Sequence, residues 1–454
     1  MSDAISFDTI CAVATPPGTA GLSVIRVSGP QTIPAVKVLF STTADLDVAP
    51  SHTIHYGWWK GGAGVIDSVT CSLYRGPNSY TGEDVVEIGC HGGLHVVDQV
   101  IATLLDQGVR LADPGEFTKR AFLNHKLDLT QVEAVADLIA SQSRVGAQTA
   151  ARQLAGGFTK RLATLRAELL DVCGLMELEL DFSEEDVEFV DKVQLAKSLR
   201  ATRDYACSLA DSASSAELLR SGFFCAVVGY PNAGKSSLFN AILSRTRAIV
   251  SDIAGTTRDY LEETIFVDGF AIHLYDTAGL RETADSIELQ GIRITTSLIE
   301  QSDLVLVVND ITEGQDHSDA LCADLRSRFS AIDVVVIQNK IDGVDIVPQN
   351  DTHTIHCSAL SGAGVADLRN LLSRRVADST SAISDVLVNA RQASLLRSAV
   401  DCLTQAIDGL ERRISNEYVT VDIRGAMRLL GDITGETWNV DVLDTIFSRF
   451  CIGK

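Results

Sequence analysis

An eight-residue segment, Gly229-Tyr-Pro-Asn-Ala-Gly-Lys235-Ser236, carries the residue types that bind phosphate groups. It follows an apolar run, Phe223–Val228, and precedes a helix-like stretch, which is the context that the pattern G-x-x-x-x-G-K-[ST] requires. The glycines allow backbone N–H groups to turn toward phosphate oxygens, and the start of the helix adds a partial positive charge. We expect Lys235 to reach the β- and γ-phosphates and Ser236 to ligate Mg²⁺.

Three further segments, each directly after a strand-like run, complete a nucleotide site. Asp276-Thr-Ala-Gly279 can hold the Mg²⁺ shell through water and donate a glycine N–H to the γ-phosphate. In Asn339-Lys340-Ile341-Asp342, the last carboxylate can accept both N1–H and N2–H₂ of guanine, whereas adenine has no matching donors. Ser358-Ala359-Leu360 can close over guanine O6 through backbone N–H groups. The four elements in this order predict GTP as the ligand.

Hydrolysis needs chemistry other than that of Ras-like enzymes. Leu280 follows the Asp276–Gly279 segment, where those enzymes carry a water-orienting glutamine. The oxygen of Asn232 could hold a monovalent cation beside the phosphates, doing the work of an arginine finger. A polar residue on the loop 280–290 would then orient the water, and the candidates are Arg281, Glu282, Asp285 and Glu288. Position alone favours a solvated loop charge for each of them.

A segment between the first two elements, Ser251-Asp-Ile-Ala-Gly-Thr256-Thr257-Arg-Asp259, can sense the γ-phosphate. A threonine there can complete the Mg²⁺ shell, the usual ordering switch. The predicted GTP contacts are therefore Asn232, Ala233, Gly234, Lys235, Ser236, Ser237, Ser251, Asp252, Ile253, Ala254, Gly255, Thr256, Thr257, Asp276, Thr277, Ala278, Gly279, Asn339, Lys340, Asp342, Ser358, Ala359 and Leu360, with Ser236 and Thr257 on Mg²⁺.

The elements that position these residues alternate between strand-like and helix-length segments, which predicts a mainly parallel sheet. Asp268-Gly269 separates two strand-like runs and predicts a hairpin with one antiparallel pair. Before this α/β block, apolar residues recur at spacings of three and four, which predicts one face of a long helix. They are Leu162, Leu165, Leu169, Val172, Met176 and Leu180. The segments 390–414 and 421–430 are also predicted helices.

The fold expected is an α/β phosphate-loop GTPase domain inserted into a helical domain and preceded by an α+β N-terminal domain. The boundaries predicted are 1–124, 125–219 and 381–454 for the N-terminal domain and the two helical parts, with the GTPase domain at 220–380. Insertion is tolerated where the ends of the inserted domain lie close together.

Composition excludes several classes of protein. Of the 454 residues, 46% are apolar and 22% charged, typical of a packed chain, and no apolar run is long enough for a membrane span. The ten cysteines are scattered without a C-x-x-C pair, which favours reduced thiols in a cytoplasm. The net charge of −22 divides into −5 for residues 1–124, −6 for 125–219, −9 for 220–380 and −2 for 381–454. No part carries the positive field of a stand-alone nucleic-acid binder.

The chain resembles the MnmE (TrmE) family of bacterial tRNA-modification GTPases from end to end. The motifs that carry the resemblance are Ala14-Thr-Pro-Pro-Gly18, Arg26-Val-Ser-Gly29, Gly76-Pro-Asn-Ser-Tyr-Thr-Gly-Glu83-Asp84, His91-Gly-Gly93, Pro114-Gly-Glu-Phe117, Ala121-Phe-Leu-Asn124, Lys126-Leu-Asp128, Thr256-Thr-Arg-Asp259 and Phe450-Cys-Ile-Gly-Lys454. Two positions depart from it: Ser251 replaces a frequent threonine, and His125 stands where an acid is common.

The resemblance implies roles for further residues. It implies a tetrahydrofolate derivative (5,10-methylene- or 5-formyl-) bound by Arg26, Glu83, Lys126 and Lys454. It also implies K⁺ held by Asn232 and by carbonyls of the loop residues Ser251, Ile253 and Thr256, and a catalytic acid at Glu288 that orients water through a bridging solvent. Lys235 is the other catalytic residue expected. Cys451 matches a proposed nucleophile, with a buried small apolar role as the alternative.

The function that the resemblance implies is K⁺-dependent GTP hydrolysis by a cytoplasmic homodimer. With an FAD-containing MnmG (GidA)-like partner in a heterotetramer, such proteins add an aminomethyl or carboxymethylaminomethyl group to C5 of the wobble uridine of certain tRNAs. The partner would make most of the tRNA contact. The alternatives are a ribosome-assembly or regulatory GTPase without RNA-modifying activity, and a scaffold with a vestigial folate pocket.

Overall fold

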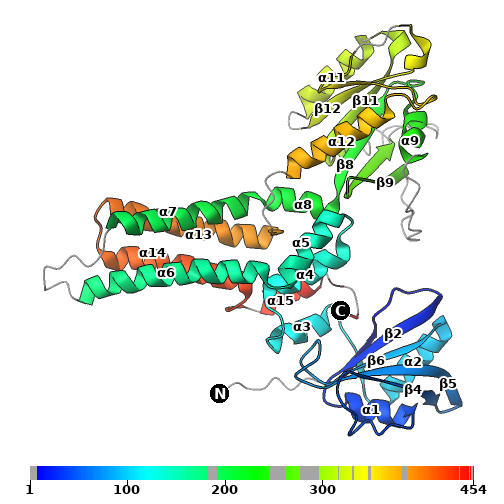
Figure 1. Cartoon of the computed structure of the whole chain (residues 1–454), viewed down its shortest axis with the longest axis vertical. Helices are drawn as coiled ribbons and strands as arrows, with labels where there is room; N and C mark the ends of the chain where they lie inside the picture. Colours follow the sequence, from blue (N-terminus) through cyan, green and yellow to red (C-terminus); the bar gives the residue numbers. More distant parts are fainter. Residues whose placement is uncertain are drawn as a thin grey trace. The chain divides into compact units, whose positions relative to one another are not determined.

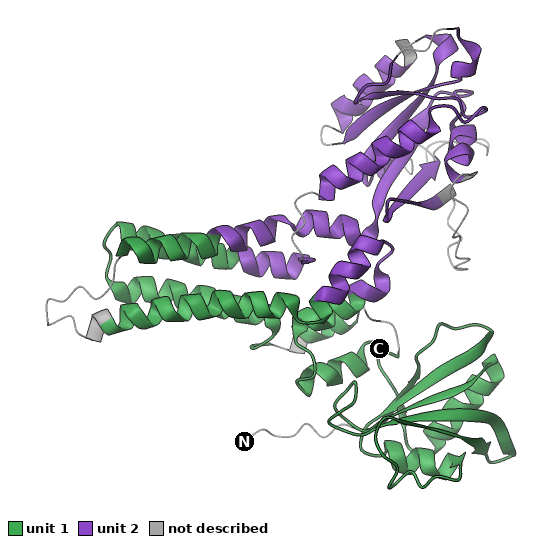
Figure 2. Ribbon diagram, in the orientation of Figure 1, with its two compact units in different colours: residues 1–136, 153–203, 398–454 green, residues 137–152, 204–397 purple. Residues whose placement is uncertain are grey.

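The computed structural model describes most of the chain, and the chain divides into two compact units (Figure 2). The first unit comprises residues 1–136, 153–203 and 398–454, and the second comprises 137–152 and 204–397. The residues described are 8–181, 192–244, 261–276, 296–314, 316–329, 332–345, 349–380, 386–438, 440–448, 450 and 453–454.

A seven-stranded sheet with the order β3-β4-β5-β6-β2-β1-β7 forms the N-terminal part of the first unit. All neighbouring strands are antiparallel except β1 and β7. The strands are β1 (Ile10–Val13), β2 (Ala20–Ser28), β3 (Phe40–Ser41), β4 (Thr53–Gly61), β5 (Gly64–Tyr74), β6 (Val85–Gly92) and β7 (Arg110–Leu111).

Two helices, α1 (Thr32–Leu39) and α2 (Leu94–Asp106), pack on this sheet (Figure 1). Val36 and Leu104 from the helices share one buried cluster with Trp59 of β4, whose indole N–H donates to Thr103 Oγ1 at 3.0 Å. Burial of large apolar side chains contributes roughly 1.5–3 kcal/mol each, so this cluster accounts for the sheet and helices folding together. The predicted α+β N-terminal domain is confirmed.

The rest of the first unit is helical. The helices that fall wholly or partly in it are α3 (Glu116–Leu123), α4 (Leu129–Ala140), the end of α5 (Arg144–Leu154), α6 (Gly157–Asp181), α7 (Lys192–Asp211), α13 (Ala390–Glu411), α14 (Asn416–Thr434) and α15 (Val440–Phe447). Ion pairs from Arg166 to Glu436 and from Arg424 to Glu177 show that α6 and α14 run antiparallel, as Figure 1 shows.

The apolar face predicted for the long helix is confirmed in α6. Leu162, Leu165, Leu169, Val172 and Met176 are all buried, and the side chain of Leu180 lies outside the described part of that helix. The two predicted C-terminal helices are present as α13 and α14. Among the described residues, no helix is both long and apolar enough to cross a membrane.

The second unit contains a six-stranded sheet with the order β13-β12-β11-β8-β10-β9. Every pair is parallel except β9 and β10. Their turn, Asp268-Gly269, has φ values of 51° and 90°, the left-handed conformation that this type of hairpin requires. The strands are β8 (Phe223–Gly229), β9 (Leu261–Val267), β10 (Phe270–Asp276), β11 (Leu304–Asp310), β12 (Asp333–Asn339) and β13 (Thr354–His356). The parallel sheet and its hairpin were both predicted correctly.

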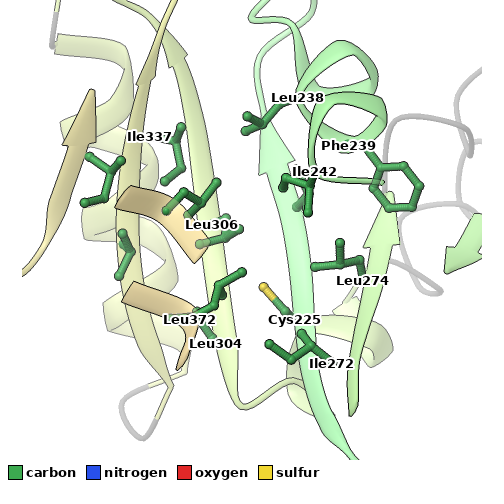
Figure 3. Packing of buried hydrophobic residues seen from close by; sticks show 14 of the residues in the cluster. Cys225, Leu238, Phe239, Ile242, Ile272, Leu274, Leu304, Leu306, Ile337 and Leu372 are labelled. Carbon is green, nitrogen blue, oxygen red and sulfur yellow. The ribbon is translucent and has the colours of Figure 1, made fainter. Parts of the chain in front are cut away.

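Helices cover both faces of this sheet. Leu238 and Ile242 of α9 (Lys235–Ser244) pack with Leu372 of α12 (Val365–Thr380) over one face, as Figure 3 shows. Cys322 and Leu325 of α11 (Asp316–Arg328) cover the other face. The carboxyl ends of the parallel strands consequently meet at one edge, where ligands bind in sheets of this kind.

Arg220 fastens the two ends of the inserted block to each other. It lies at the end of α8 (Ala213–Ser221), directly before β8, and forms a two-point ion pair with Asp137 at 2.7 and 2.9 Å. The same guanidinium donates to the carbonyls of Leu387 (2.9 Å) and Val388 (3.3 Å), where the chain returns toward α13. Ala150 of α5 (Arg144–Leu154) packs beside Leu387. The two ends of the insert therefore lie together, as an insertion requires.

Candidate functional site

The phosphate loop connects β8 to α9 and is shaped by close backbone approaches. A Cβ atom at Gly229 would lie 2.2 Å from the carbonyl oxygen of Val308, and one at Gly234 would lie 2.3 Å from Asn339 Nδ2. Both glycines have positive φ, as does Asn232 at 66°. Only glycine fits at the first two positions, and asparagine is among the residues that tolerate the third.

Lys235 and Ser236 begin helix α9 on the inner side of this loop. The Lys235 ammonium donates to the carbonyls of Gly229 (3.0 Å) and Tyr230 (2.9 Å), so it lies across the loop in which phosphates would be held. The Ser236 hydroxyl donates to Asp276 Oδ2 at 3.0 Å. The structure therefore brings together the serine predicted to ligate Mg²⁺ and the acid predicted to support its water shell. A hydroxyl beside a buried carboxylate is a donor set that suits this oxygen-seeking ion.

Asn339 joins the phosphate loop to the two loops that are predicted to bind the base. Its side chain is buried, donates through Nδ2 to the carbonyl of Ala233 at 2.9 Å, and accepts through Oδ1 from the N–H of Ala359 at 3.0 Å. Three of the predicted elements thus meet at one amide. The amide is held from both sides, so it fixes their spacing before any ligand binds.

The predicted guanine carboxylate, Asp342, is exposed at the same edge of the sheet. Its Oδ1 accepts a hydrogen bond from the hydroxyl of Ser358, which orients the carboxylate. The N–H groups of Ser358 and Ala359 already donate to Ala363 O (2.9 Å) and Asn339 Oδ1, and Leu360 is 88% exposed. The loop predicted to close over guanine therefore carries two backbone donors that are engaged within the protein.

Several predicted site residues lie outside the described residues. They are Ser251, Asp252, Ile253, Ala254, Gly255, Thr256, Thr257, Thr277, Ala278, Gly279, Glu288 and Cys451, together with the other candidate loop charges Arg281, Glu282 and Asp285. The strands that border the two central segments are described. Leu261 at the start of β9 pairs with Asp276 at the end of β10, and Asp276 accepts from the Ser236 hydroxyl, so these two strand ends lie beside the phosphate loop.

Arg26, in β2 of the N-terminal sheet, lies near Lys454. Arg26 donates to Glu87 Oε1 at 2.9 and 2.7 Å and reaches the carbonyl of Gly453 at 3.5 Å. Burial lowers the pKa of the Lys454 ammonium, the nearby Arg26 charge lowers it further, and Glu87 opposes both. Two neighbouring cations, one of them partly desolvated, suit a carboxylate such as a folate glutamate tail.

Glu83 and Lys126 are near each other but are engaged differently. Glu83 Oε2 accepts from the Ser28 hydroxyl at 2.6 Å, and both Glu83 carboxylate oxygens accept from Arg120 Nη1 at 3.2 Å. Lys126 donates to the Pro77 carbonyl at 2.9 Å, and its stem lies beside Gly82. The Glu83 carboxylate, which is expected to contact the folate, is thus already paired with a cation that is 1% exposed.

Three charged partners of the predicted site residues were not expected from the sequence: Glu87, Arg120 and Asp310. Arg120 had a detectable signal, because it stands four residues after Glu116 on α3 and pairs with it at 2.8 Å. Glu87 and Asp310 had none, since their partners lie 61 and 30 residues away in the sequence.

The fold and these contacts define a GTPase of the phosphate-loop class. The chain belongs to the MnmE (TrmE) family. The family model for the MnmE helical domain matches residues 129–451, and the model for the GTP-binding protein TrmE N-terminus matches residues 9–126.

Similar curated proteins cover nearly the whole chain. The tRNA modification GTPase MnmE of Salinibacter ruber is 44% identical over 98% of this chain and 99% of its own length. The proteins of that name from Flavobacterium psychrophilum and Cytophaga hutchinsonii are 40% and 39% identical, over 99% and 98% of this chain and 100% and 98% of their own lengths.

Proposed function

We propose that this chain hydrolyses GTP in a K⁺-dependent way in order to support modification of the wobble uridine of certain tRNAs. Its full-length similarity to proteins named for tRNA modification is the observation that carries the proposal. It acts as a cytoplasmic homodimer with an FAD-containing MnmG-like partner, which makes most of the tRNA contact. The modification added at C5 is an aminomethyl or carboxymethylaminomethyl group, with its methylene carbon supplied by a folate.

The domain boundaries predicted from the sequence give each part a role in this proposal. Residues 1–124 would hold the folate, residues 125–219 and 381–454 would form the helical domain, and residues 220–380 would hold GTP. Arg26, Glu83, Lys126 and Lys454 are the proposed folate contacts. The adjacent cations Arg26 and Lys454 support a carboxylate-binding role, and Glu83 would have to share its charge with Arg120.

Around GTP, the residues divide the work by chemical type. Lys235 neutralises phosphate charge, and Ser236 and Thr257 would hold Mg²⁺. Asn232 with the loop residues Ser251, Ile253 and Thr256 would hold K⁺, and Glu288 would orient water. Cys451 would act on the uracil ring or serve as a small apolar residue. Mg²⁺ and K⁺ would supply charge stabilisation on the transferring phosphoryl group.

The cation requirement gives a direct prediction. We expect GTP turnover to be at least about tenfold faster in K⁺ than in Na⁺, because an arginine finger or its substitute contributes much more than this to phosphoryl transfer. Asn232→Gly should remove the difference between the salts, since glycine keeps the left-handed backbone and deletes the side-chain oxygen. Steady-state phosphate release measures both. Equal rates in the two salts for the natural chain would contradict the proposal.

Folate binding gives a second prediction. We expect Arg26→Ala to weaken binding of 5-formyltetrahydrofolate by at least about tenfold, because it removes a charge-assisted donor and leaves Glu87 beside the site unpaired. Lys60→Ala, which deletes an exposed cation from β4 of the same sheet, should have no effect. Equilibrium titration of the purified chain is the measurement. A natural chain that does not bind the folate would favour a scaffold with a vestigial pocket.

The rival function is a ribosome-assembly or regulatory GTPase that modifies no RNA. The modification state of wobble uridines in cells that lack this chain separates the two. Loss of the C5 group supports tRNA modification, whereas normal tRNA combined with defective ribosomal subunits supports the rival. The negative charge on every segment of the chain disfavours an appended RNA-binding module.

A further inference from the structure

Asp310 is a buried carboxylate at the edge of the sheet that carries the nucleotide site. It ends strand β11, pairs in register with Asn339 at the end of β12, and is 5% exposed. Burying a charged group costs several kcal/mol unless hydrogen bonds compensate for the lost water. The position thus needs an explanation, and the nucleotide contacts predicted from the sequence do not include it.

Three hydrogen bonds converge on this carboxylate. Oδ1 accepts from the N–H of Thr312 at 3.0 Å and from its hydroxyl at 2.7 Å, and Oδ2 accepts from the Lys340 ammonium at 2.5 Å. Burial alone would raise the pKa of Asp310, but the bonds from Lys340 and Thr312 outweigh it and lower that pKa. The carboxylate is therefore ionised at neutral pH and forms a charge-assisted pair with Lys340.

Lys340 lies between Asn339 and Asp342 in the segment that is predicted to bind guanine. Its neighbour Asn339 is tied to the phosphate loop, and Asp342 follows two residues later. Its own backbone is left-handed, with φ of 65°, and its side chain remains 40% exposed although the ammonium is anchored. A lysine held at its tip and at its backbone presents a fixed row of methylene groups to solvent, and such stems cover apolar surfaces well.

Thr312 connects the Asp310 carboxylate to the turn that follows Lys340. It lies in the turn Ile311–Glu313, which Asp310 caps. A Cβ atom placed on Gly343, in the turn Ile341–Gly343, would lie 3.3 Å from the Thr312 methyl group. The Asp310 carboxylate consequently holds the turn Ile311–Glu313 through the N–H of Thr312, and the turn Ile341–Gly343 through the Lys340 ammonium.

We propose that Asp310 is a positioning residue for the guanine base. By anchoring the Lys340 ammonium, it fixes the lysine stem as an apolar platform beside the Asp342 carboxylate, so that a purine ring is held by its face as well as its edge. Asp310 acts through Lys340 and does not itself touch the nucleotide.

A double-mutant cycle on the full-length chain tests this role, with fluorescent GDP as the probe. Asp310→Asn keeps an oxygen for the Thr312 N–H but loses the charge that binds Lys340, and should weaken the binding of GDP about tenfold. Lys340→Met keeps an apolar stem and frees it. If Asp310 acts through Lys340, Asp310→Asn should cause no further loss in the Lys340→Met background. KM for GTP should rise in Asp310→Asn while kcat stays within about twofold.

Asp303→Asn is the matched control. Asp303 directly precedes the opposite end of β11, is half-buried, and accepts from the N–H of Phe224 at 2.8 Å, so its substitution tests the general effect of neutralising an aspartate of this sheet. It should leave GDP affinity unchanged. Unchanged GDP affinity in Asp310→Asn, or a loss that adds in full to that of Lys340→Met, would overturn the proposal.

If Asp310→Asn fails to fold, Thr312→Val provides a second test. Thr312→Val removes a hydrogen bond to the Asp310 carboxylate, so it should lower GDP affinity in the natural chain but not in the Lys340→Met chain. Equal losses of GDP affinity in the two chains would overturn the proposal.

Discussion

Asp342→Asn should lower the affinity of the chain for GTP by about two orders of magnitude and raise its affinity for xanthosine triphosphate. The carboxylate is exposed at the sheet edge and held by the Ser358 hydroxyl, and an asparagine oxygen can accept that same bond. The loop should therefore keep its shape while the acceptor facing guanine N1–H and N2–H₂ becomes partly a donor. A site built to pair specific donors rejects a mismatched partner strongly, because buried polar groups are left unpaired.

Competition titrations with guanosine and xanthosine nucleotides measure this change. Asp345→Asn, an exposed aspartate three residues further along the same loop, serves as the control and should alter neither affinity. If Asp342→Asn weakened both nucleotides equally, the carboxylate would be needed for the loop and not for recognition of the base.

Asn339→Ala should reduce GTP affinity by about a hundredfold and also lower the thermal midpoint of the chain. The substitution leaves the carbonyl of Ala233 and the N–H of Ala359 without their partner inside the protein. Each unsatisfied buried group costs roughly 1–3 kcal/mol, and the two losses fall on the phosphate loop and on the loop beside the base. Both halves of the nucleotide site therefore lose their fixed spacing together.

Nucleotide titration and thermal unfolding together distinguish this effect from simple destabilisation. Asn350→Ala is the matched control, because Asn350 also supports a loop of this domain by accepting from the His356 N–H at 2.8 Å. It should lower stability without a comparable loss of GTP affinity. Equal affinity losses in the two variants would show that the bridge made by Asn339 has no specific role.

The central sheet was predictable because its signals are local. Short apolar runs, Asp268-Gly269 and the phosphate-loop pattern each lie within a few residues, and each was found where it was expected. The α6 face was equally readable, since five of its predicted residues are buried. Such features depend on spacing along one element, which a single sequence records directly.

The partners of the site residues were not predictable, because they are set by tertiary contacts. Glu83 was expected to be available to a ligand, but Arg120 comes from 37 residues away to pair with it. Likewise, Ser358-Ala359-Leu360 was predicted to offer backbone donors to guanine, while the structure engages two of them with the protein. Spacing indicates which residue types can do chemistry, but not which neighbours already satisfy them.

The guanidinium of Arg220 has a consequence for how this chain can be taken apart. Arg220 lies just before β8, and its guanidinium donates to the backbone carbonyls of both Leu387 and Val388. If the whole insert were removed, the two chain ends left behind would therefore be separated by about the length of one arginine side chain. A spacer of about four residues covers such a gap, at roughly 3.3–3.6 Å each. The inserted GTPase domain can thus be removed and replaced by one short linker, which leaves the two parts of the helical domain joined.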